Sequence, residues 1–595
     1  MIKEIKYEEL RIKEKLIAFK VNEEIVGKML RDFGNDVLKV IEDKPYVLCH
    51  YMYDLELIKE IIEKNKGCKC KEESSKNIVA ATIIHVLETV TAIEGHAFIY
   101  REELVVRAKK NDEIATDELI DGVLEHLELQ GEIVIDKDTV GKVCIYPGNL
   151  YKAEVQVANL VSYLVESDKA DNKDLEKANI FLKNYKCGDI TLNDGQQEAV
   201  RLAVSRSISI VCGGAGNGKT TVIKAICDAF MYFGQSNIKL LSFTGKAVER
   251  ASAITGIQAT TIHRLLGLRE DGRKKVDRIK ADVIIVDEVG MLGLELFNML
   301  IQSVKENKDI KLVLVGDQNQ LPSIAPGNVF KDLIQSSVIP VVRMTETVRQ
   351  EKDSLIIANS NKVLRGITLD GSNAGLRLKQ GEFEFIEADS EKIKEKVISA
   401  IDKLLGKGES IYDIQVISPI KGGDNGVEEL NRDIADKFNY VSGREVYKFG
   451  VLDPIIVVRN NSKKEVFNGQ RGMAIRVERN MSRTEAVVVD FNGKEVTFQN
   501  NELDAIEVAY ASTVHKMQGS ESPIVVIVVD KEQSKMLTRE LLYVAITRGA
   551  KRVILIGDKE TFNIGVRNKS NMRNSLLMQR LKDINKSIVT RGIVR

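Results

Sequence analysis

A glycine-rich segment is the first place where this sequence could do chemistry. Residues 208–212 form an apolar run that predicts a strand. Glycines let backbone N–H groups close around phosphate oxygens, and the amino end of a following helix adds positive potential. Here the lysine would contact the β- and γ-phosphates of a nucleotide, and the hydroxyl after it would hold Mg²⁺. The segment is Gly213, Gly214, Ala215, Gly216, Asn217, Gly218, Lys219, Thr220 and Thr221.

A pair of acidic residues follows about 70 residues later. Residues 283–286 form a second apolar run, and Asp287 and Glu288 come directly after it. An aspartate at a strand end beside a phosphate-binding loop can hold Mg²⁺, and the next glutamate can orient or deprotonate the attacking water. An Asp-Glu pair alone is more often a solvated turn, but its place after an unbroken apolar strand favours the catalytic interpretation.

Three further polar residues could complete such a site. Residues 311–316 predict a third strand, and Gln320, just after it, can sense the γ-phosphate through a hydrogen bond. Arg548 precedes another predicted strand and could supply positive charge to the transition state from a second domain; Arg349 is a second candidate. For both arginines, a surface or helix-capping position remains the alternative.

The elements that must position these residues follow the rhythm of an α/β fold. Short apolar strands alternate with helices over residues 188–342, and again over 343–440 and 508–595, which is typical of two parallel-sheet domains. Residues 441–507 instead show short β runs with hairpin signals at Asn468-Gly469 and Asn492-Gly493. We interpret this segment as a small antiparallel β-barrel inserted into the second domain.

The residues before the first α/β domain predict a helical architecture. Residues 1–75 form short amphipathic helices, and Phe33-Gly34 ends one of them. Residues 76–187 are typical of two helices, a hairpin turning at Asp138 and a linker helix. We interpret them as a winged-helix-like module.

Composition and charge limit the class of protein. The chain has 595 residues, and 87 Lys and Arg balance 87 Asp and Glu, which excludes a globally basic nucleic-acid coat. Residues 531–595 hold 15 Lys and Arg against 5 Asp and Glu, so this local excess could touch a DNA backbone or form a solvated basic surface. We expect no apolar run of the ~18 residues that would predict a membrane span. Seven cysteines give no disulfide framework, which predicts the cytoplasm.

Taken together, the motifs resemble those of superfamily 1 helicases, and most closely the RecD-like, 5′-to-3′ branch. That resemblance implies two RecA-like motor domains with ATP between them. The Q motif of the family contacts adenine, a role that falls on Gln196 here, with Gln197 as the alternative. The matching segments are 192–200 (Q motif), 213–221, 243–247, 261–266, 287–291, 316–327, 349–350, 513–521 (which contains Gln518 and Gly519 at the nucleotide) and 542–548.

The resemblance also implies which side chains face nucleic acid. Phosphate contacts of this kind do not depend on base sequence, which suits movement along a strand. For His263, a core or capping position is the alternative. The implied residues are Thr244, His263, Pro322, Ser323, Thr513 and His515 in the motor domains, with Asn468 and Arg471 in the insertion.

The N-terminal part resembles stand-alone RecD-like helicases at residues 32–46 and 95–104. It departs from them after residue 46, where the glycines of their helix-hairpin-helix are missing. The segment at 268–281, where the family inserts a strand-separating pin, is short.

The function that this sequence predicts is an ATP-dependent 5′-to-3′ DNA helicase or translocase in DNA repair or recombination. Its cofactors would be ATP and Mg²⁺, and its substrates single-stranded DNA and junctions of single- and double-stranded DNA. We expect a monomeric motor without membrane attachment, with a single-strand-binding or repair protein as partner. Two alternatives stay open: an ATP-switched nucleic-acid clamp or remodeller, and a motor subunit of an exonuclease complex.

Overall fold

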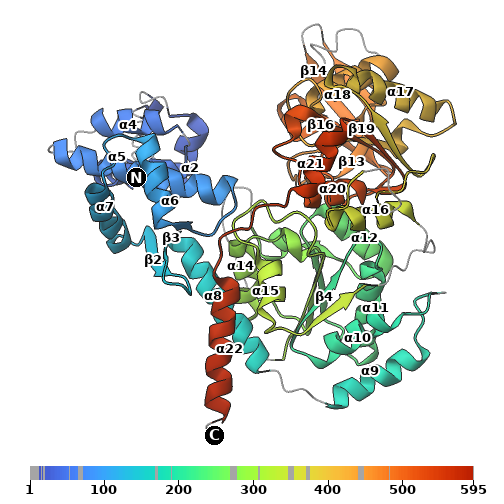
Figure 1. Cartoon of the computed structure of the whole chain (residues 1–595), viewed down its shortest axis with the longest axis horizontal. Coiled ribbons are helices and arrows are strands. Elements are labelled where there is room, and N and C mark those ends of the chain that lie inside the picture. Colours follow the sequence, from blue (N-terminus) through green and yellow to red (C-terminus); the bar gives the residue numbers. More distant parts are fainter. Residues whose placement is uncertain are drawn as a thin grey trace.

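The structure is a computed structural model of the 595-residue chain. A helical N-terminal lobe stands beside two α/β domains, and the last helix returns to lie between the lobe and the first of these domains (Figure 1). The structure describes all residues except 1–11, 15, 18–20, 53, 65–70, 168–171, 189, 269–277, 306–308, 346–353, 370–374, 440–447, 462, 481–482 and 594–595.

The N-terminal lobe combines helices with one small antiparallel sheet, in the order β1-β3-β2. The predicted turn at Asp138 is confirmed: its Oδ1 accepts hydrogen bonds from the N–H groups of Val140 and Lys142. The predicted helix end at Phe33 is also confirmed, since Gly34 there has a φ of 58°. The elements are α2 (Glu23–Phe33), α3 (Val37–Asp43), η2 (Pro45–His50), α4 (Leu55–Lys64), α5 (Lys71–Glu88), η3 (Thr89–Ile93), β1 (Ile99–Tyr100), α6 (Arg101–Asn111), α7 (Asp117–Leu129), β2 (Ile133–Lys137), β3 (Val143–Pro147) and α8 (Gly148–Glu166).

The centre of this lobe is a long apolar helix that the composition argument missed. Among the described residues, Glu72–Ile93 is one helix long and apolar enough to cross a membrane by length and composition. However, 61% of its apolar window is buried inside the protein, where α5 packs against η2, α4, α6 and α7. The expectation that no such run exists was therefore wrong, and burial in the core accounts for its apolar character.

The first α/β domain contains a six-stranded parallel sheet in the order β6-β5-β7-β8-β4-β9. Its strands β4, β5, β7 and β8 lie where the apolar runs predict them. Because the strands are parallel, the residues that follow them meet at one edge of the sheet. The elements are α9 (Asn172–Asn184), α10 (Asp194–Ser205), β4 (Ile208–Gly213), α11 (Lys219–Tyr232), β5 (Ile238–Ser242), α12 (Gly245–Thr255), β6 (Thr260–Thr261), α13 (Ile262–Leu265), β7 (Val283–Val286), α14 (Leu294–Val304), β8 (Lys311–Gly316), α15 (Val329–Ser336) and β9 (Val341–Met344).

The second α/β domain has a five-stranded parallel sheet in the order β10-β19-β18-β11-β17. The two parallel-sheet domains that the strand rhythm predicts are thus confirmed. The elements are α16 (Leu355–Leu364), β10 (Phe383–Glu387), α17 (Ile393–Leu405), β11 (Ile414–Ser418), α18 (Val427–Phe438), β17 (Ala511–Thr513), β18 (Ser522–Val529), α20 (Arg539–Ile546), β19 (Gly549–Gly557) and α21 (Lys559–Arg567).

An antiparallel sheet interrupts the second domain between α18 and β17, in the order β15-β14-β13-β12-β16. The Asn492-Gly493 turn joins β14 to β15, with φ values of 56° and 92° as a tight hairpin requires. Asn468-Gly469 instead lies in the connection 458–470, before β13, because this loop reaches across to the first domain. Closure of the sheet into a barrel stays a prediction. The strands are β12 (Pro454–Val457), β13 (Arg471–Arg479), β14 (Thr484–Phe491), β15 (Lys494–Gln499) and β16 (Ile506–Val508).

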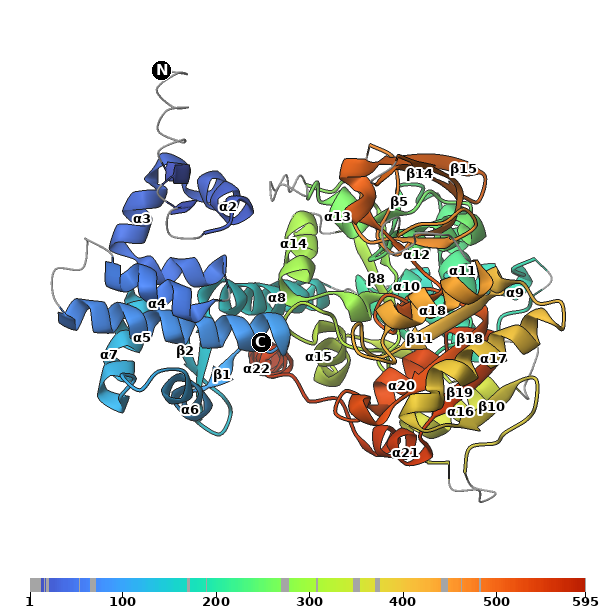
Figure 2. The same cartoon turned by 90° about the horizontal axis from the view of Figure 1, so that it is seen from above.

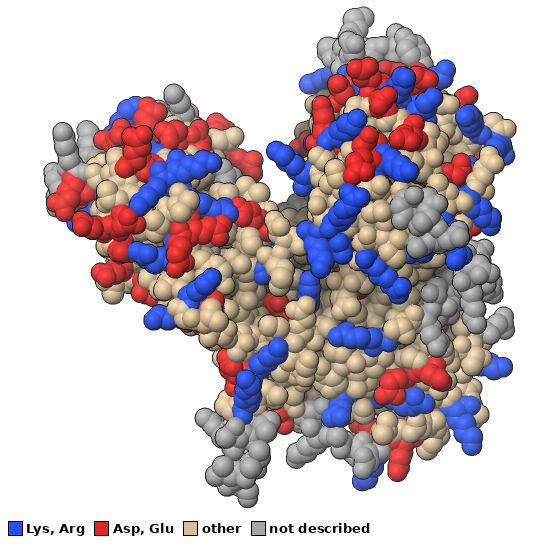
Figure 3. Space-filling model, viewed as in Figure 1, with Lys and Arg blue, Asp and Glu red and all other residues tan. Residues whose placement is uncertain are grey.

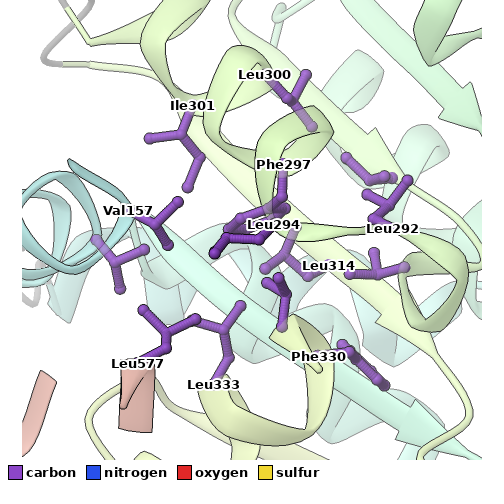
Figure 4. Close-up of a cluster of buried hydrophobic side chains, with 14 of the residues drawn as sticks. Val157, Leu292, Leu294, Phe297, Leu300, Ile301, Leu314, Phe330, Leu333 and Leu577 are labelled. Atoms are coloured by element: carbon purple, nitrogen blue, oxygen red, sulfur yellow. The ribbon is translucent and has the colours of Figure 1, made fainter. Parts of the chain in front are cut away.

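The final helix, α22 (Leu577–Ile593), packs against α8 and α15 rather than against its own domain (Figure 2). Leu577 is fully buried and lies near Val157 of α8 and Leu333 of α15 (Figure 4). The tail therefore contributes to the core shared by the N-terminal lobe and the first α/β domain.

Charges of both signs are mixed over the face seen in Figure 3. Lys and Arg side chains gather beside the hollow that separates the N-terminal lobe from the α/β domains. A local basic surface thus coexists with a net charge of zero.

Candidate nucleotide site and nucleic-acid interface

The glycine-rich loop forms a cradle between β4 and α11. Gly216 and Gly218 have φ values of 79° and 74°, a left-handed conformation that favours glycine and turns the loop back on itself. Lys219 opens α11, and its ammonium donates hydrogen bonds to the carbonyl oxygens of Gly213 at 2.8 Å and Gly214 at 3.1 Å. Neutral oxygens hold this cation without neutralising it, so it can be redirected to an anionic ligand.

Asp287 and Glu288 follow β7 at the same edge of the sheet. Burial, with a smaller effect from the neighbouring Glu288, raises the pKa of Asp287 to about 7. Glu288 has a left-handed φ of 55°, a strained conformation for a residue that is not glycine. Its Oε2 is buried and makes no hydrogen bond within the described part of the chain. A buried carboxylate oxygen without a partner among the described residues is available to accept a hydrogen bond from an attacking water.

The second domain contributes Arg548 to this cleft. The residue is 6% exposed, and its guanidinium donates to the carbonyl oxygens of Val544 at 3.1 Å and Ser520 at 3.0 Å. Side chains from both domains therefore line one cleft. From the predicted set these are Gly214, Ala215, Gly216, Asn217, Gly218, Lys219, Thr220, Thr221, Asp287, Glu288, Gln320, Gly519 and Arg548.

The other predicted nucleotide residues that the structure describes do not line the cleft. Gly213 precedes it as the last residue of β4. Gln196 is buried and exchanges capping hydrogen bonds with Asn193 at the start of α10. Gln197 donates to the carbonyl oxygen of Leu192 at 3.0 Å. Gln518 is 6% exposed, and Arg349 lies outside the described residues.

Tyr543 contacts the phosphate-binding loop, and the sequence argument gave it no role. It belongs to α20 of the second domain, is 2% exposed, and its hydroxyl donates to Asp317 Oδ2 at 2.8 Å. The hydroxyl oxygen of Tyr543 also accepts a hydrogen bond from the backbone N–H of Ala215 at 3.0 Å. Tyr543 thus joins the helix before Arg548 to the phosphate-binding loop. Its position within the 542–548 motif was the sequence feature from which a role for Tyr543 could have been predicted.

A second contact across the cleft joins α12 to the 513–521 segment. Arg250 Nη1 lies 3.3 Å from Glu521 Oε1, and both residues line the cleft. No local pattern predicts this pair, because its partners come from different domains.

The insertion reaches the same helix. A Cβ atom on Gly245 would lie 2.4 Å from the Cβ of Phe467, so the phenylalanine packs directly on the glycine backbone. Gln470 donates to Glu249 Oε1 at 3.0 Å. A Cβ on Gly519 would lie 3.2 Å from Thr244 Oγ1. The start of α12, the insertion loop and the 513–521 segment therefore meet at one junction, which holds the predicted nucleic-acid residue Thr244.

The remaining predicted nucleic-acid residues differ in exposure. Thr513, half-buried at the end of β17, accepts a hydrogen bond from Lys516 N at 3.4 Å, and His515 is exposed. Asn468 is exposed in the insertion loop. His263 is half-buried and packs edge-on against Phe243, with 5.5 Å between ring centroids; burial lowers its pKa.

Pro322 is half-buried, whereas Ser323 is only 3% exposed, and its hydroxyl donates to the carbonyl oxygen of Ala325 at 2.7 Å. No finding tests the nucleic-acid roles of these residues, and they stay predictions.

Two half-buried cations add positive potential near the junction. Burial lowers the pKa of Arg471 to about 10, and its guanidinium donates only long hydrogen bonds, to Ser522 Oγ at 3.4 Å and the carbonyl oxygen of Ala509 at 3.5 Å. Burial, together with nearby Arg471, lowers the pKa of Lys246 to about 8. An anion would relieve this concentration of charge.

Comparisons with known proteins found similar families, relatives and solved structures. Residues 191–381 match a family described as AAA domain, and 508–556 one described as UvrD-like helicase C-terminal domain. An ATP-dependent RecD2 DNA helicase from Deinococcus radiodurans is 29% identical over 74% of this chain and 59% of that protein. A RecBCD enzyme subunit RecD from Mycolicibacterium smegmatis is 28% identical over 65% of this chain and 74% of that protein. A solved Pif1 helicase from Bacteroides, in complex with ADP-AlF3 and single-stranded DNA, is 18% identical over 67% of this chain and 98% of that chain, with a TM-score of 0.39.

The two family matches fall on the two parallel-sheet domains that face the cleft. The relatives are similar to the chain over 74% and 65% of its length. The phosphate-binding loop lies within the first family match and Arg548 within the second. Over these segments the chain is similar to DNA helicases and helicase subunits described as RecD2 and RecD.

Proposed function

We propose that this protein is an ATP-dependent DNA helicase that moves 5′ to 3′ along single-stranded DNA. The observation that carries the proposal is the composite cleft, in which the phosphate-binding loop of one domain faces Arg548 of the other. Such a cleft closes on a nucleotide and opens after hydrolysis, so it converts hydrolysis into movement between domains. The polarity rests on the resemblance to the RecD-like branch.

Each cleft residue has a role in this proposal. Lys219 binds the β- and γ-phosphates, and Glu288 orients the attacking water and takes its proton. Gln320 senses the γ-phosphate, and Arg548 stabilises negative charge in the transition state. Thr220 and Asp287 would hold Mg²⁺, and their hydroxyl and carboxylate oxygens suit this cation. Bound Mg²⁺ would neutralise charge where burial now raises the pKa of Asp287.

The junction at α12 is the proposed place where single-stranded DNA crosses both domains. Thr244, Arg471 and Thr513 would bind phosphates there, in the potential of Lys246. The N-terminal module has the element order helix, strand, two helices and two strands, with the sheet order β1-β3-β2. We propose a winged-helix-like module here and a small barrel in the insertion. We also propose that the protein is a monomer, lies in the cytoplasm and acts in DNA repair or recombination.

A second candidate is a motor subunit of a larger exonuclease complex. The relative from Mycolicibacterium smegmatis carries that description, whereas the Deinococcus relative is described as a helicase in its own right. Since the chain spans 59% of the length of the Deinococcus protein, its activity has to be measured directly.

Strand displacement on two matched DNA duplexes, one with a 5′ tail and one with a 3′ tail, tests the proposal. ATP consumption is followed in the same samples. Displacement of the 5′-tailed duplex alone would support the helicase and its polarity. Displacement of the 3′-tailed duplex alone would overturn the polarity. DNA-stimulated hydrolysis without displacement would favour the clamp or the subunit.

A further inference from the structure

The segment after α21 links three parts of the molecule. The carbonyl oxygen of Asn568 accepts a hydrogen bond from Arg539 N at 3.0 Å. Ser570 donates through both N and Oγ to Glu540 Oε2, each at 2.9 Å. Residues 568–570 are therefore fixed to the start of α20, the helix that precedes Arg548.

Arg573, a few residues later, is bound to the first α/β domain. Its Nη1 donates to Ser323 Oγ at 3.2 Å and to the carbonyl oxygens of Ala325 and Gly327, each at 2.9 Å. These acceptors lie on the loop that directly follows Gln320, the predicted γ-phosphate sensor. One guanidinium thus holds the loop that leads out of the nucleotide cleft.

The N-terminal lobe also contacts Arg573. A Cβ atom on Gly95 would lie 2.3 Å from the guanidinium carbon, so only the bare glycine backbone, with its φ of 77°, fits against Arg573. Gly327 N donates to the carbonyl oxygen of Gly95 at 2.9 Å. Asn574 exchanges further bonds with the same turn: its N–H donates to His96 Nδ1, and its carbonyl accepts from Ala97 N, each at 2.8 Å. The Gly-His segment of the N-terminal lobe thus receives the tail.

The tail is anchored beyond this point. Glu154, fully buried in α8, accepts hydrogen bonds from Ser575 Oγ at 3.0 Å and Leu576 N at 3.2 Å. Arg580 donates to Glu154 Oε1 at 2.9 Å and to Asp136 Oδ2 at 2.7 Å. Two of the basic residues that composition placed on a DNA-facing or solvated surface, Arg573 and Arg580, are therefore engaged within the protein.

The free link between the two attachments is short. Residues 571 and 572 alone separate Ser570, bound to α20, from Arg573, bound to the loop at 323–327. An extended chain reaches at most ~3.6 Å per residue. Movement of α20 away from this loop must therefore either extend residues 571 and 572 or displace Arg573.

We propose that Arg573 is a positioning residue that holds the loop at 323–327 and makes its position depend on the movement of α20. This inference rests on the proposed function, because the loop lies between the γ-phosphate sensor and the predicted DNA-facing Pro322-Ser323. It assigns the tail a role in coupling the nucleotide cleft to DNA.

An arginine suits this position better than a lysine. Its planar guanidinium packs flat against Gly95 and presents donors in a fixed geometry, whereas an ammonium is a strongly hydrated point charge. Burial lowers the pKa of Arg573 to about 10, so the side chain stays charged at neutral pH.

The test compares Arg573→Ala, Arg573→Lys and a variant with four glycines inserted between Asn571 and the 81% exposed Met572. The control is Arg567→Ala, from the same segment, whose 58% exposed guanidinium pairs with Glu560. Amide hydrogen exchange over residues 321–328 is measured in each full-length chain. ATP turnover is then measured against the concentration of single-stranded DNA.

In Arg573→Ala we expect exchange over residues 321–328 to accelerate about tenfold, because three hydrogen bonds into the loop are lost. We expect the DNA concentration for half-maximal turnover to rise about tenfold, with less than about a threefold fall in maximal rate. Arg573→Lys should recover only part of both effects. The glycine insertion should leave amide exchange over residues 321–328 at the wild-type rate but raise the DNA concentration for half-maximal turnover. In Arg567→Ala, both quantities should stay within about twofold of wild type.

Unchanged exchange together with unchanged DNA dependence in Arg573→Ala would overturn the proposal. Full recovery by lysine would also overturn it, since charge alone would then suffice. If wild-type turnover does not respond to DNA, the proposed function fails, and hydrogen exchange still decides whether Arg573 holds the loop. If Arg573→Ala does not fold, the lysine variant and the glycine insertion decide.

Discussion

The nucleotide cleft and the contact of α22 with the N-terminal lobe hold arginines in opposite ways. In the cleft, Arg548 donates to backbone carbonyls and to the Thr547 hydroxyl, all of them neutral. At the tail, Arg580 pairs with the carboxylates of Glu154 and Asp136, and its guanidinium lies 4.8 Å from the centroid of the Tyr151 ring.

The difference distinguishes Arg548, whose charge stays available to a ligand, from Arg580, whose charge is neutralised within the fold. Neutral oxygens orient a cation and leave its charge available, and the ammonium of Lys219 is held in the same way. Paired carboxylates neutralise a cation, so its removal leaves a buried charge uncompensated. We therefore expect loss of the cleft cations to reduce catalytic rate at little cost in stability, and loss of Arg580 to reduce stability at little cost in rate.

Replacement of Lys219 by alanine should have the largest effect on rate. We expect ATP turnover to fall about 10³-fold, because the loop loses its charge on the β- and γ-phosphates. The midpoint of thermal unfolding should stay near that of wild type. Lys224→Ala, on the same helix with its ammonium 3.2 Å from Asp228, is the matched control. Normal turnover in Lys219→Ala would remove the loop from the active site.

Replacement of Arg580 by alanine should have the opposite effect, a loss of stability with little change in turnover. Glu154 is fully buried, so we expect a loss of about 3 kcal/mol in the free energy of unfolding. Turnover per folded molecule should stay within about twofold of wild type. Denaturant unfolding of this variant beside Arg567→Ala checks the prediction. A loss of turnover without a loss of stability would contradict the distinction between the two regions.

Tyr543→Phe should give a smaller change in rate. The variant keeps the ring but loses the hydrogen bonds to Asp317 and Ala215, which join α20 to the phosphate-binding loop. We expect about a tenfold fall in DNA-stimulated turnover. Tyr412→Phe, which removes a hydroxyl bonded to the carbonyl oxygen of Leu452 in an exposed region, is the control. Equal rates in the two variants would show that the contact is structural only.

The pH dependence of stability should show the smallest effect. Burial lowers the pKa of His50, but hydrogen bonds with Glu132 and Glu88 outweigh this effect. The resulting pKa is about 9, above the ordinary value of 6.5. Because the folded pKa is the higher one, the contribution is complete below pH 6.5 and is lost as pH rises through about 9.

We expect a contribution of about 1 kcal/mol, since the side chain is 36% exposed and solvent screens the pair. Unfolding free energies of wild type and His50→Gln at pH 6 and pH 9.5 measure it. The gap between the two proteins should narrow at the higher pH, and a constant gap would argue against protonated His50.

The sequence predicted the motor domains because their signals are local. Apolar runs marked β4, β7 and β8, and the polar residue after each run then met at one sheet edge. The winged-helix-like and barrel interpretations used coarser patterns, and only their hairpins at Asp138 and Asn492-Gly493 could be placed.

What the sequence could not predict depends on contacts between distant segments. Phe467 packs on Gly245, so Asn468-Gly469 belongs to a long connection rather than to a tight hairpin. Arg573 and Arg580 looked like basic surface because their partners come from the N-terminal lobe and from the loop after β8. The apolar length of α5 became explicable only once neighbouring helices covered it.

The central claim is that two domains share one nucleotide site, and the measurement that tests it most directly is ATP turnover by Arg548→Ala at saturating single-stranded DNA. Nucleotide affinity, measured with a fluorescent ATP analogue, should stay within a few-fold of wild type, because Lys219 and the loop remain. Turnover should fall about 10³-fold, since the charge that Arg548 supplies to the transition state is lost. Wild-type turnover in this variant would show that Arg548 does not act on the nucleotide, and the shared site would be wrong.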